Sequence, residues 1–280
     1  NYYNHSRIIL KTRRLIYNDI KKCIFDFLNN IIATIKDRKH KQNKSHTLSS
    51  EKNLLEEFKQ EVSMVDLTLD ELHNRNVFLL IDQSGSMAKQ DAANSDLSRW
   101  DSLREMVMGH VNSIFKKKIT DSISICLFSR NKFNNEIFKV RNISQVENIF
   151  REHEPDQATF IVPTLKHFLD IYFDEEDQPK PQPAFFIIYT DGQFDDREEF
   201  EELIKATCKK LDDQRHIKIF IIGVGSEIKN KINKDYFEKL NKNAINNKNK
   251  HGKPCDIVGF DIADEMENIL KVLENELKQK

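Results

Sequence analysis

From about residue 77 onward, the chain alternates short apolar runs with longer segments of helical spacing. Three runs are almost entirely apolar over five or six positions, which is typical of parallel strands covered on both faces. They are Val77–Ile81, Ala184–Tyr189 and Ile217–Ile222. The segments between them repeat apolar residues every three or four positions, as amphipathic helices do. This alternation predicts an α/β fold with an open, mostly parallel sheet and helices on both faces.

The same patterns predict the remaining elements of this region. Further strands are expected at 123–128, 137–140 and 257–260, of which 137–140 is expected to be an antiparallel edge strand. Helices are expected at 100–115, 144–151, 163–173, 198–211 and 264–277. Asp195 or Asp196 is expected to be the N-cap of the fourth of these helices. Six strands in this order form one complete domain.

The N-terminal part has a different character. From Ser6 to about Lys36, one apolar stripe recurs at spacings of three and four, which predicts an amphipathic helix. Its members are Ile16, Ile20, Ile24, Phe27, Ile31 and Ile35. Residues 1–50 carry eleven Lys or Arg against three Asp, although the whole chain has a net charge of −1. We therefore predict a basic amphipathic helical arm and linker at 1–50, a short helix and linker at 51–74, and the α/β domain at 75–280.

The basic arm has three interpretations. Its isoleucine face can dock on the α/β domain or on a neighbouring subunit, it can lie on an anionic membrane surface, or it can contact nucleic acid. The aromatic residues of the arm form no evident stacking platform for bases. The apolar stripe is explained better by packing against protein, which we favour.

The four cysteines are far apart in sequence. Cys23, Cys126, Cys208 and Cys255 form no CxxC pair and no zinc-ligand spacing, and three of them lie in apolar segments. Buried free thiols indicate a reducing compartment. We expect an intracellular, cytoplasmic location. An organellar location stays open because the sequence begins with Asn1, so that a transit peptide would not be visible.

One loop concentrates oxygen ligands. The sequence Asp82-Gln83-Ser84-Gly85-Ser86 directly follows the first apolar run, and a second carboxylate, Asp191, follows another. Parallel strands of such sheets bring their ligand-binding loops to the carboxyl edge. One carboxylate and two hydroxyls at alternate positions can converge on a single point. Hydroxyls, carboxylates and water suit Mg²⁺ or Mn²⁺ better than Zn²⁺.

These residues resemble a known family site. The run from Asp82 to Met87 resembles the metal-ion-dependent adhesion site of von Willebrand factor A domains. Thr190-Asp191-Gly192 and Ile222-Gly223-Val224-Gly225 are similar to the family's downstream landmarks, in the same order. The likeness covers about residues 75–279. It implies a Rossmann-like fold with six strands.

Three further motifs resemble intracellular bacterial A-domain proteins in particular. They are Ser98-Arg99-Trp100, Glu154-Pro155 and Asp256-Ile257-Val258.

The resemblance also implies a ligand set. In the family, two serines and a threonine bind the ion directly, and the aspartates act mostly through water. Carried over to this sequence, the metal ligands are Asp82, Ser84, Ser86, Thr159 and Asp191. Thr159 is preferred as the threonine because Leu165 follows it at the family's spacing, and Thr164 in the next helix is the alternative. The loop departs from the family pattern at Gln157-Ala158, where glycines are usual, and at Phe160.

The implied function is non-catalytic. In the family, the ion accepts a carboxylate oxygen from an Asp or Glu of another protein, so we expect a metal-dependent protein-binding module. The alternative is a structural subunit of a large assembly, in which the domain is a scaffold and the basic arm docks on neighbours. An enzyme is not expected, because the sequence has no Gly-x-Ser-x-Gly elbow, no phosphate-binding Gly-x-x-x-x-Gly-Lys loop and no His-Glu-x-x-His motif.

The arm generates a testable prediction. If the chain is an assembly subunit, the double substitution of Ile24 and Phe27 by Asp should abolish its incorporation in low and high salt alike. The reason is that each large apolar side chain contributes about 1.5–3 kcal/mol when fully buried. A purely electrostatic arm would instead weaken steadily with salt. Co-purification of tagged chains with the assembly measures this, and full incorporation of a chain lacking residues 1–50 would contradict it.

Overall fold

The computed structural model describes residues 72–91, 96–133, 136–156, 158–173, 182–192, 194–244 and 246–278. The predicted arm at 1–50, and the short segment at 51–74 up to residue 71, lie outside these residues. Their assignments remain predictions. In the described part of the chain, no helix is long and apolar enough to cross a membrane.

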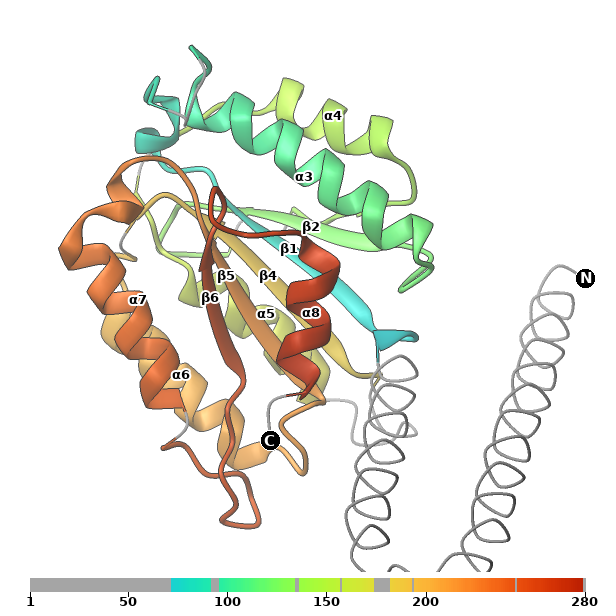
Figure 1. The fold of residues 1–280 in the computed structure, drawn as a ribbon, viewed down its shortest axis with the longest axis vertical. Helices are drawn as coiled ribbons and strands as arrows, with labels where there is room; N and C mark the ends of the chain where they lie inside the picture. The colour runs from blue at the N-terminus through green and yellow to red at the C-terminus, as the bar shows by residue number, and fades with distance from the viewer. Residues whose placement is uncertain are drawn as a thin grey trace, which may run out of the picture. The chain divides into compact units, whose positions relative to one another are not determined.

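A six-stranded sheet forms the centre of the domain (Figure 1). Its strands are β1 (Asn76–Asp82), β2 (Ile123–Phe128), β3 (Phe138–Val140), β4 (Ala184–Thr190), β5 (Ile217–Gly223) and β6 (Val258–Ile262). They lie in the order β3-β2-β1-β4-β5-β6, and every neighbouring pair is parallel except β2 with β3. Every residue of β4 and β5 is buried. The predicted α/β class, the Rossmann-like order and the antiparallel edge strand are confirmed.

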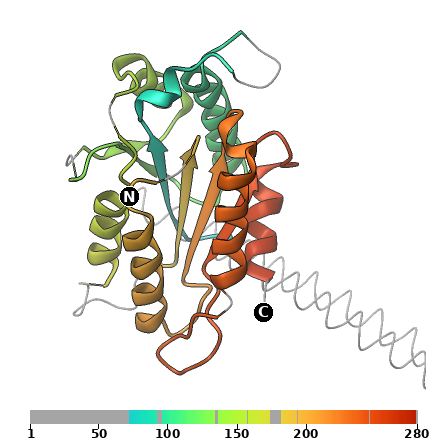
Figure 2. The same cartoon turned by 90° about the vertical axis from the view of Figure 1, so that its left-hand side faces the viewer.

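Helices cover both faces of the sheet (Figures 1 and 2). They are α3 (Arg99–Lys116), α4 (Ile143–Glu152), α5 (Val162–Phe173), α6 (Arg197–Lys210), α7 (Lys231–Ala244) and α8 (Ile269–Lys278), with short 3-10 turns η1 (Gly85–Ala88) and η2 (Glu227–Lys229). One core cluster joins the sheet to α3, α4 and α8, and a second joins its other face to α5, α6 and α7. Each central strand therefore buries side chains on both faces, which explains the continuous apolar runs.

The structure corrects the start of one predicted helix and contains one helix that the sequence pattern did not predict. The closing helix begins at Ile269 rather than at residue 264, because the chain first turns at Ile262, whose carbonyl accepts from the amides of Glu265 and Met266. The Asn268 carboxamide then accepts from the Lys271 amide at 2.9 Å, as an N-cap does.

Helix α7 was not predicted at all. Its sequence is rich in Asn and Lys, so only a few apolar residues mark its inner face. Among them, Phe237 is 0% exposed and Leu240 is 7% exposed. A stripe this thin is hard to separate from a polar loop by periodicity alone.

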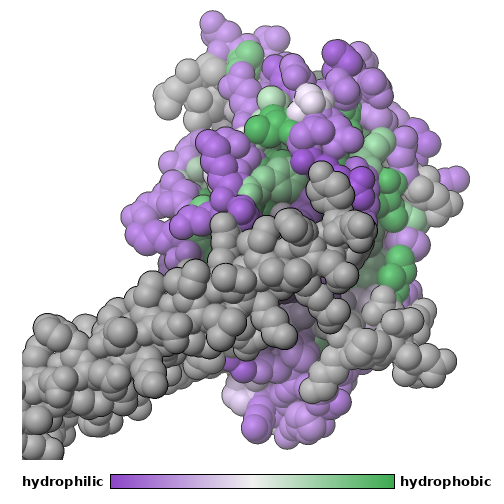
Figure 3. All heavy atoms as spheres, turned by 90° about the vertical axis from the view of Figure 1, so that its right-hand side faces the viewer, coloured by the Kyte–Doolittle hydropathy of each residue, from purple (hydrophilic) through white to green (hydrophobic). Residues whose placement is uncertain are grey.

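The carboxyl ends of the parallel strands meet at one edge. Figure 2 shows the arrows of β1, β4 and β5 pointing the same way, toward η1 and the segment before α7. On another face, the part that Figure 3 shows in colour is mostly hydrophilic, with small hydrophobic areas between the polar side chains. The predicted ligands Asp82, Ser84, Ser86 and Asp191 lie at or just after the ends of β1 and β4, so the loops at the carboxyl edge carry them.

The sheet generates a stability prediction. Leu80 in β1 is fully buried, so Leu80→Ala should lower the free energy of unfolding by about 2–5 kcal/mol. Ile232 in α7 is 71% exposed, so the matched variant Ile232→Ala should change it by less than about 0.5 kcal/mol. Urea denaturation followed by circular dichroism measures both. Equal losses in the two variants would contradict the burial assigned to β1.

Candidate metal centre

The loop after β1 folds two serines over the end of the strand. Asp82 is the last residue of β1, and its Oδ1 accepts from the Ser84 amide at 2.8 Å. The 3-10 turn η1 then reverses the chain, so that the Ser84 and Ser86 hydroxyls lie 3.0 Å apart. Asp82 and Ser84 are buried, whereas Gly85 is exposed and Ser86 is half-buried. The loop thus places one half-buried hydroxyl, that of Ser86, above a buried hydroxyl and a buried carboxylate.

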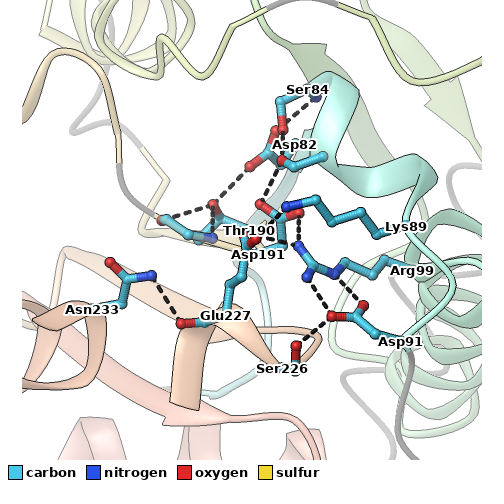
Figure 4. A network of polar contacts seen from close by, with 12 residues as sticks. Asp82, Ser84, Lys89, Asp91, Arg99, Thr190, Asp191, Ser226, Glu227 and Asn233 are labelled. Carbon is cyan, nitrogen blue, oxygen red and sulfur yellow. Dashed lines mark hydrogen bonds and ion pairs between the residues drawn. The ribbon is translucent and has the colours of Figure 1, made fainter. Parts of the chain in front are cut away.

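The end of β4 supplies the facing residues. Because β1 pairs with β4 in parallel, with Ile81 opposite Tyr189, both strands leave the sheet at the same level. The Thr190 hydroxyl donates to Asp82 Oδ2 at 2.7 Å, and the Ser86 hydroxyl donates to Asp191 Oδ1 at 3.0 Å. Figure 4 shows Asp82, Thr190 and Asp191 pointing toward one another. Four of the five predicted ligands therefore lie in one cluster: Asp82, Ser84, Ser86 and Asp191.

The two carboxylates of this cluster are electrostatically unfavourable in the metal-free protein. Burial and the neighbouring charge of Asp191 raise the pKa of Asp82 to about 7. Burial likewise raises the pKa of Asp191, against the opposing effect of Arg99. A buried cation reverses this effect, because it favours the charged carboxylate.

The donor chemistry fits a hard divalent cation. The cluster consists of carboxylate and hydroxyl oxygens, and the hydrogen-bonded oxygen pairs lie 2.7–3.0 Å apart. No sulfur or imidazole is among these groups. Mg²⁺ and Mn²⁺ prefer such oxygen ligands. In the described residues, no group of three or more His, Cys, Asp or Glu side chains is arranged to hold a metal ion, so the hydroxyls are essential to the proposed ligand set.

A buried arginine adjoins the cluster. Arg99, the first residue of α3, has a side chain that is 1% exposed. Its Nη1 donates to Asp191 Oδ2 at 2.5 Å, while its Nε and Nη2 donate to the two oxygens of Asp91, each at 2.5 Å. Nη1 also lies 3.3 Å from Glu227 Oε2, and Glu227 forms an ion pair with Lys89 (Figure 4). Asp191 is therefore shared between Ser86 and a fixed positive charge.

The loop with the predicted threonine lies at the same edge. The Asp156 amide donates to the Gln83 carbonyl at 2.6 Å, and the Gln83 carboxamide donates to the Glu154 carbonyl at 2.7 Å. Farther along, the Thr159 amide donates to Asp195 Oδ2 at 2.8 Å, and the Thr159 carbonyl accepts from the Asp195 amide at 2.9 Å. The loop is thus tied to the turn after β1 on one side and to the turn after β4 on the other.

Thr164, the alternative threonine, has a different environment. It lies within α5, and its side chain is buried. Thr159 lies in the loop that borders the candidate centre. We retain Thr159 as the proposed fifth ligand.

The acidic turn after β4 has an aspartate at the predicted N-cap position, but its hydrogen bonds differ from those of an N-cap. Asp196 stands at the N-cap position of α6, but its carboxylate makes no cap hydrogen bond there. Instead, its two oxygens accept from the amides of Ile161 and Val162 at 3.1 and 2.8 Å. Asp196 therefore satisfies the free amides at the start of α5 rather than those of its own helix.

Thr190 and Arg99 belong to the motifs found in the sequence, but neither was predicted to take part in the metal centre. Their partners lie 108 and 92 residues away in the chain, at Asp82 and Asp191. No local spacing carries that information. The one usable signal was a threonine directly before Asp191 at the end of a strand paired with β1.

A family model for the von Willebrand factor type A domain matches residues 76–252, which is more than half of the chain. This chain belongs to the von Willebrand factor type A (VWA) family. The match begins at β1 and includes the whole cluster described above. No curated protein sequence matches the chain.

Solved structures similar to this chain include three at low sequence identity. Manganese-loaded TRAP protein of Plasmodium vivax is 16% identical, with a TM-score of 0.47, and 74% of each chain is covered. The VWA domain of SpRpn10 is 12% identical with a TM-score of 0.45, covering 72% of this chain and 94% of that one. The pilus adhesin SpaC from Lactobacillus rhamnosus GG is 13% identical with a TM-score of 0.46, covering 74% and 30%.

The two threonines of the VWA domain generate a prediction. Thr159→Ala should remove most of the stabilisation by Mg²⁺, because it deletes a proposed ligand. Thr164→Ala should leave the Mg²⁺ response intact and lower the free energy of unfolding by about 0.5–3 kcal/mol, because it shortens a buried side chain. Thr159→Ser, which keeps a hydroxyl, is the matched control. Thermal melts with Mg²⁺ and with EDTA measure the response, and its loss in Thr164→Ala alone would contradict the assignment.

Proposed function

We propose that this VWA domain is a metal-dependent protein-binding module that holds Mg²⁺ or Mn²⁺ and takes a partner's Asp or Glu side chain. The observation that carries the proposal is the convergence of Asp82, Ser84, Ser86 and Asp191 at the carboxyl edge of the sheet, with Thr190 bonded to Asp82. Two buried carboxylates without a matching pair of cations favour a doubly charged ion. The family is the supporting context, since VWA domains are often interaction modules.

In the proposed site, the hydroxyls and the carboxylates have different roles. Ser84 and Ser86 would hold the ion through neutral hydroxyls, together with Thr159, while Asp82 and Asp191 would balance its charge. A bound Mg²⁺ with few charged ligands retains an electrophilic position for an external carboxylate oxygen. Half-buried Ser86 and exposed Gly85 border the surface, so a partner can reach that position without rearranging the sheet.

The geometry also supports a non-catalytic role. An aspartate nucleophile or base needs a free oxygen directed at its substrate. Both oxygens of Asp82 are already acceptors, Oδ1 from the Ser84 amide and Oδ2 from the Thr190 hydroxyl. Asp191 is likewise held on both oxygens, by Ser86 and by Arg99. These carboxylates are therefore positioned for structural and electrostatic work.

We also propose an intracellular, reducing location for the protein. Three of its cysteines, Cys126, Cys208 and Cys255, are buried free thiols in the structure. Burial raises the pKa of the Cys126 thiol to about 12, which keeps it protonated and unreactive. Such thiols persist where disulfide formation is not enforced.

Removal of one ligand tests the metal site. Mg²⁺ at a hundred times its dissociation constant should raise the free energy of unfolding of the wild type by about 2.7 kcal/mol. Asp82→Ala should abolish this increment and leave the circular dichroism spectrum unchanged, because the side chain ends the strand rather than supporting it. Asp213→Ala, which changes a carboxylate paired with Arg215 outside the cluster, is the control.

Partner capture tests the second half of the proposal. Tagged full-length chain should retain its partner from its source extract in Mg²⁺ and release it in EDTA, and Asp82→Ala should retain none. A melting temperature indifferent to both Mg²⁺ and EDTA would overturn the metal site. Capture that persists in EDTA would overturn the metal-dependent grip.

A further inference from the structure

Arg99 occupies an unusual position for a charged side chain. Only 1% of it is exposed, yet it does not form a simple pair, because three carboxylates converge on it: Asp91, Asp191 and Glu227. The two oxygens of Asp91 accept hydrogen bonds from Arg99 Nε and Nη2, and the Ser226 hydroxyl also donates to Asp91. Figure 4 shows this chain of contacts running from the end of β4 to the segment before η2.

The backbone makes room for this arginine. Gly225 has a φ of +77°, and a Cβ built on it would lie 2.6 Å from Arg99 Nε. A positive φ disfavours most side chains, and the close approach disfavours any side chain at all. The segment after β5 is thus shaped around the guanidinium. A surface arginine that merely pairs with an acid would need no such accommodation.

The charges of the network can be assigned in pairs. Arg99 balances Asp91, its bidentate partner, and Lys89 balances Glu227. After this pairing, Asp82 and Asp191 carry the two negative charges in excess, although Asp191 also contacts Arg99. Their joint charge equals that of one divalent ion. Any change in how Arg99 is neutralised therefore changes the field at the metal site.

We propose that Arg99 is a positioning residue that draws Asp191 away from the ion and so keeps the loaded site receptive to a partner's carboxylate. This inference rests on the proposed function of the same site. Asp191 has one oxygen bonded to Arg99 Nη1 at 2.5 Å and the other bonded to Ser86 at 3.0 Å. With Oδ2 held by Arg99, Asp191 reaches the site through the Ser86 hydroxyl rather than with both oxygens. Less anionic charge then acts directly on the ion.

Asp91 sets how strongly Arg99 acts. Pairing with Arg99 keeps the pKa of Asp91 well below its usual range, so Asp91 is charged whenever the protein is folded near neutral pH. Without that charge, the full positive charge of Arg99 would face Asp191 and the ion. The affinity for Mg²⁺ should therefore fall when Asp91 is neutralised and rise when Arg99 is neutralised. A residue that only supports the fold would weaken binding in both cases.

Opposite shifts in Mg²⁺ affinity test the proposal. Calorimetric titration of the full chain with MgCl₂ should give about tenfold weaker binding for Asp91→Asn and about tenfold tighter binding for Arg99→Gln. Arg99→Lys, which keeps the charge, should remain within about threefold of the wild type. Arg215→Gln alters an arginine–aspartate pair outside the network and should change nothing. Circular dichroism in EDTA verifies that each variant is folded.

The outcomes separate this inference from the proposed function. If the wild type binds no Mg²⁺, both are overturned. If the wild type binds Mg²⁺ but Asp91→Asn and Arg99→Gln both weaken it, or neither changes it, the role of Arg99 is overturned and the proposed function stands. If Arg99→Gln does not fold, Asp91→Asn with Arg99→Lys decides, because Asp91 is 32% exposed and Asn has nearly the same size and shape. Weaker binding in Asp91→Asn alone supports the proposal, and equal weakening in the two variants overturns it.

Discussion

The arrangement at the carboxyl edge depends on the hydrogen bond from Thr190 to Asp82. Both residues end their strands, and the bond forms because β1 and β4 run in parallel with Ile81 opposite Tyr189. A slip of one residue in either strand would turn Asp82 or Thr190 toward the opposite face. Side chains on both faces of these strands are buried, so a slip would exchange the residues that pack on the two sides of the sheet and disrupt both core clusters. The geometry of the candidate centre is thus set by packing that lies well below it.

The arrangement is costly before a ligand arrives. Two carboxylates lie in a buried cluster, one with its pKa raised to about 7. The protein offsets part of this cost by hydrogen bonds to Ser84, Thr190 and Ser86, and part by the buried charge of Arg99. Buried charges that remain incompletely paired are unusual in a purely structural domain. In the proposed function, this electrostatic imbalance would be relieved by the bound cation.

The sequence contained most of the fold because the fold is periodic. Continuous apolar runs located β1, β4 and β5, and helical spacing located α3 to α6 within one or two residues. Four of the five predicted ligands lie in one cluster because a single short loop supplies three of them. Other features depend on contacts between distant residues: Asp196 satisfies amides of α5 rather than its own helix, and Arg99 joins Asp91, Asp191 and Glu227. The spacing of residues along the sequence does not show which distant residues make contact. The pattern also failed to predict α7, because only a few apolar residues mark its inner face.

The fit between Gly225 and Arg99 bears on how this protein can diverge. The space that a side chain would need at position 225 is filled by the guanidinium, so the two positions are not free to change separately. Any lineage that replaced the arginine with a small residue would relieve the crowding at the glycine, whereas one that kept it would keep the glycine as well. The pair should therefore be inherited together. Among diverged relatives, the pair would identify those in which an arginine still contacts the carboxylates at this edge of the sheet, even where the strand sequences have changed.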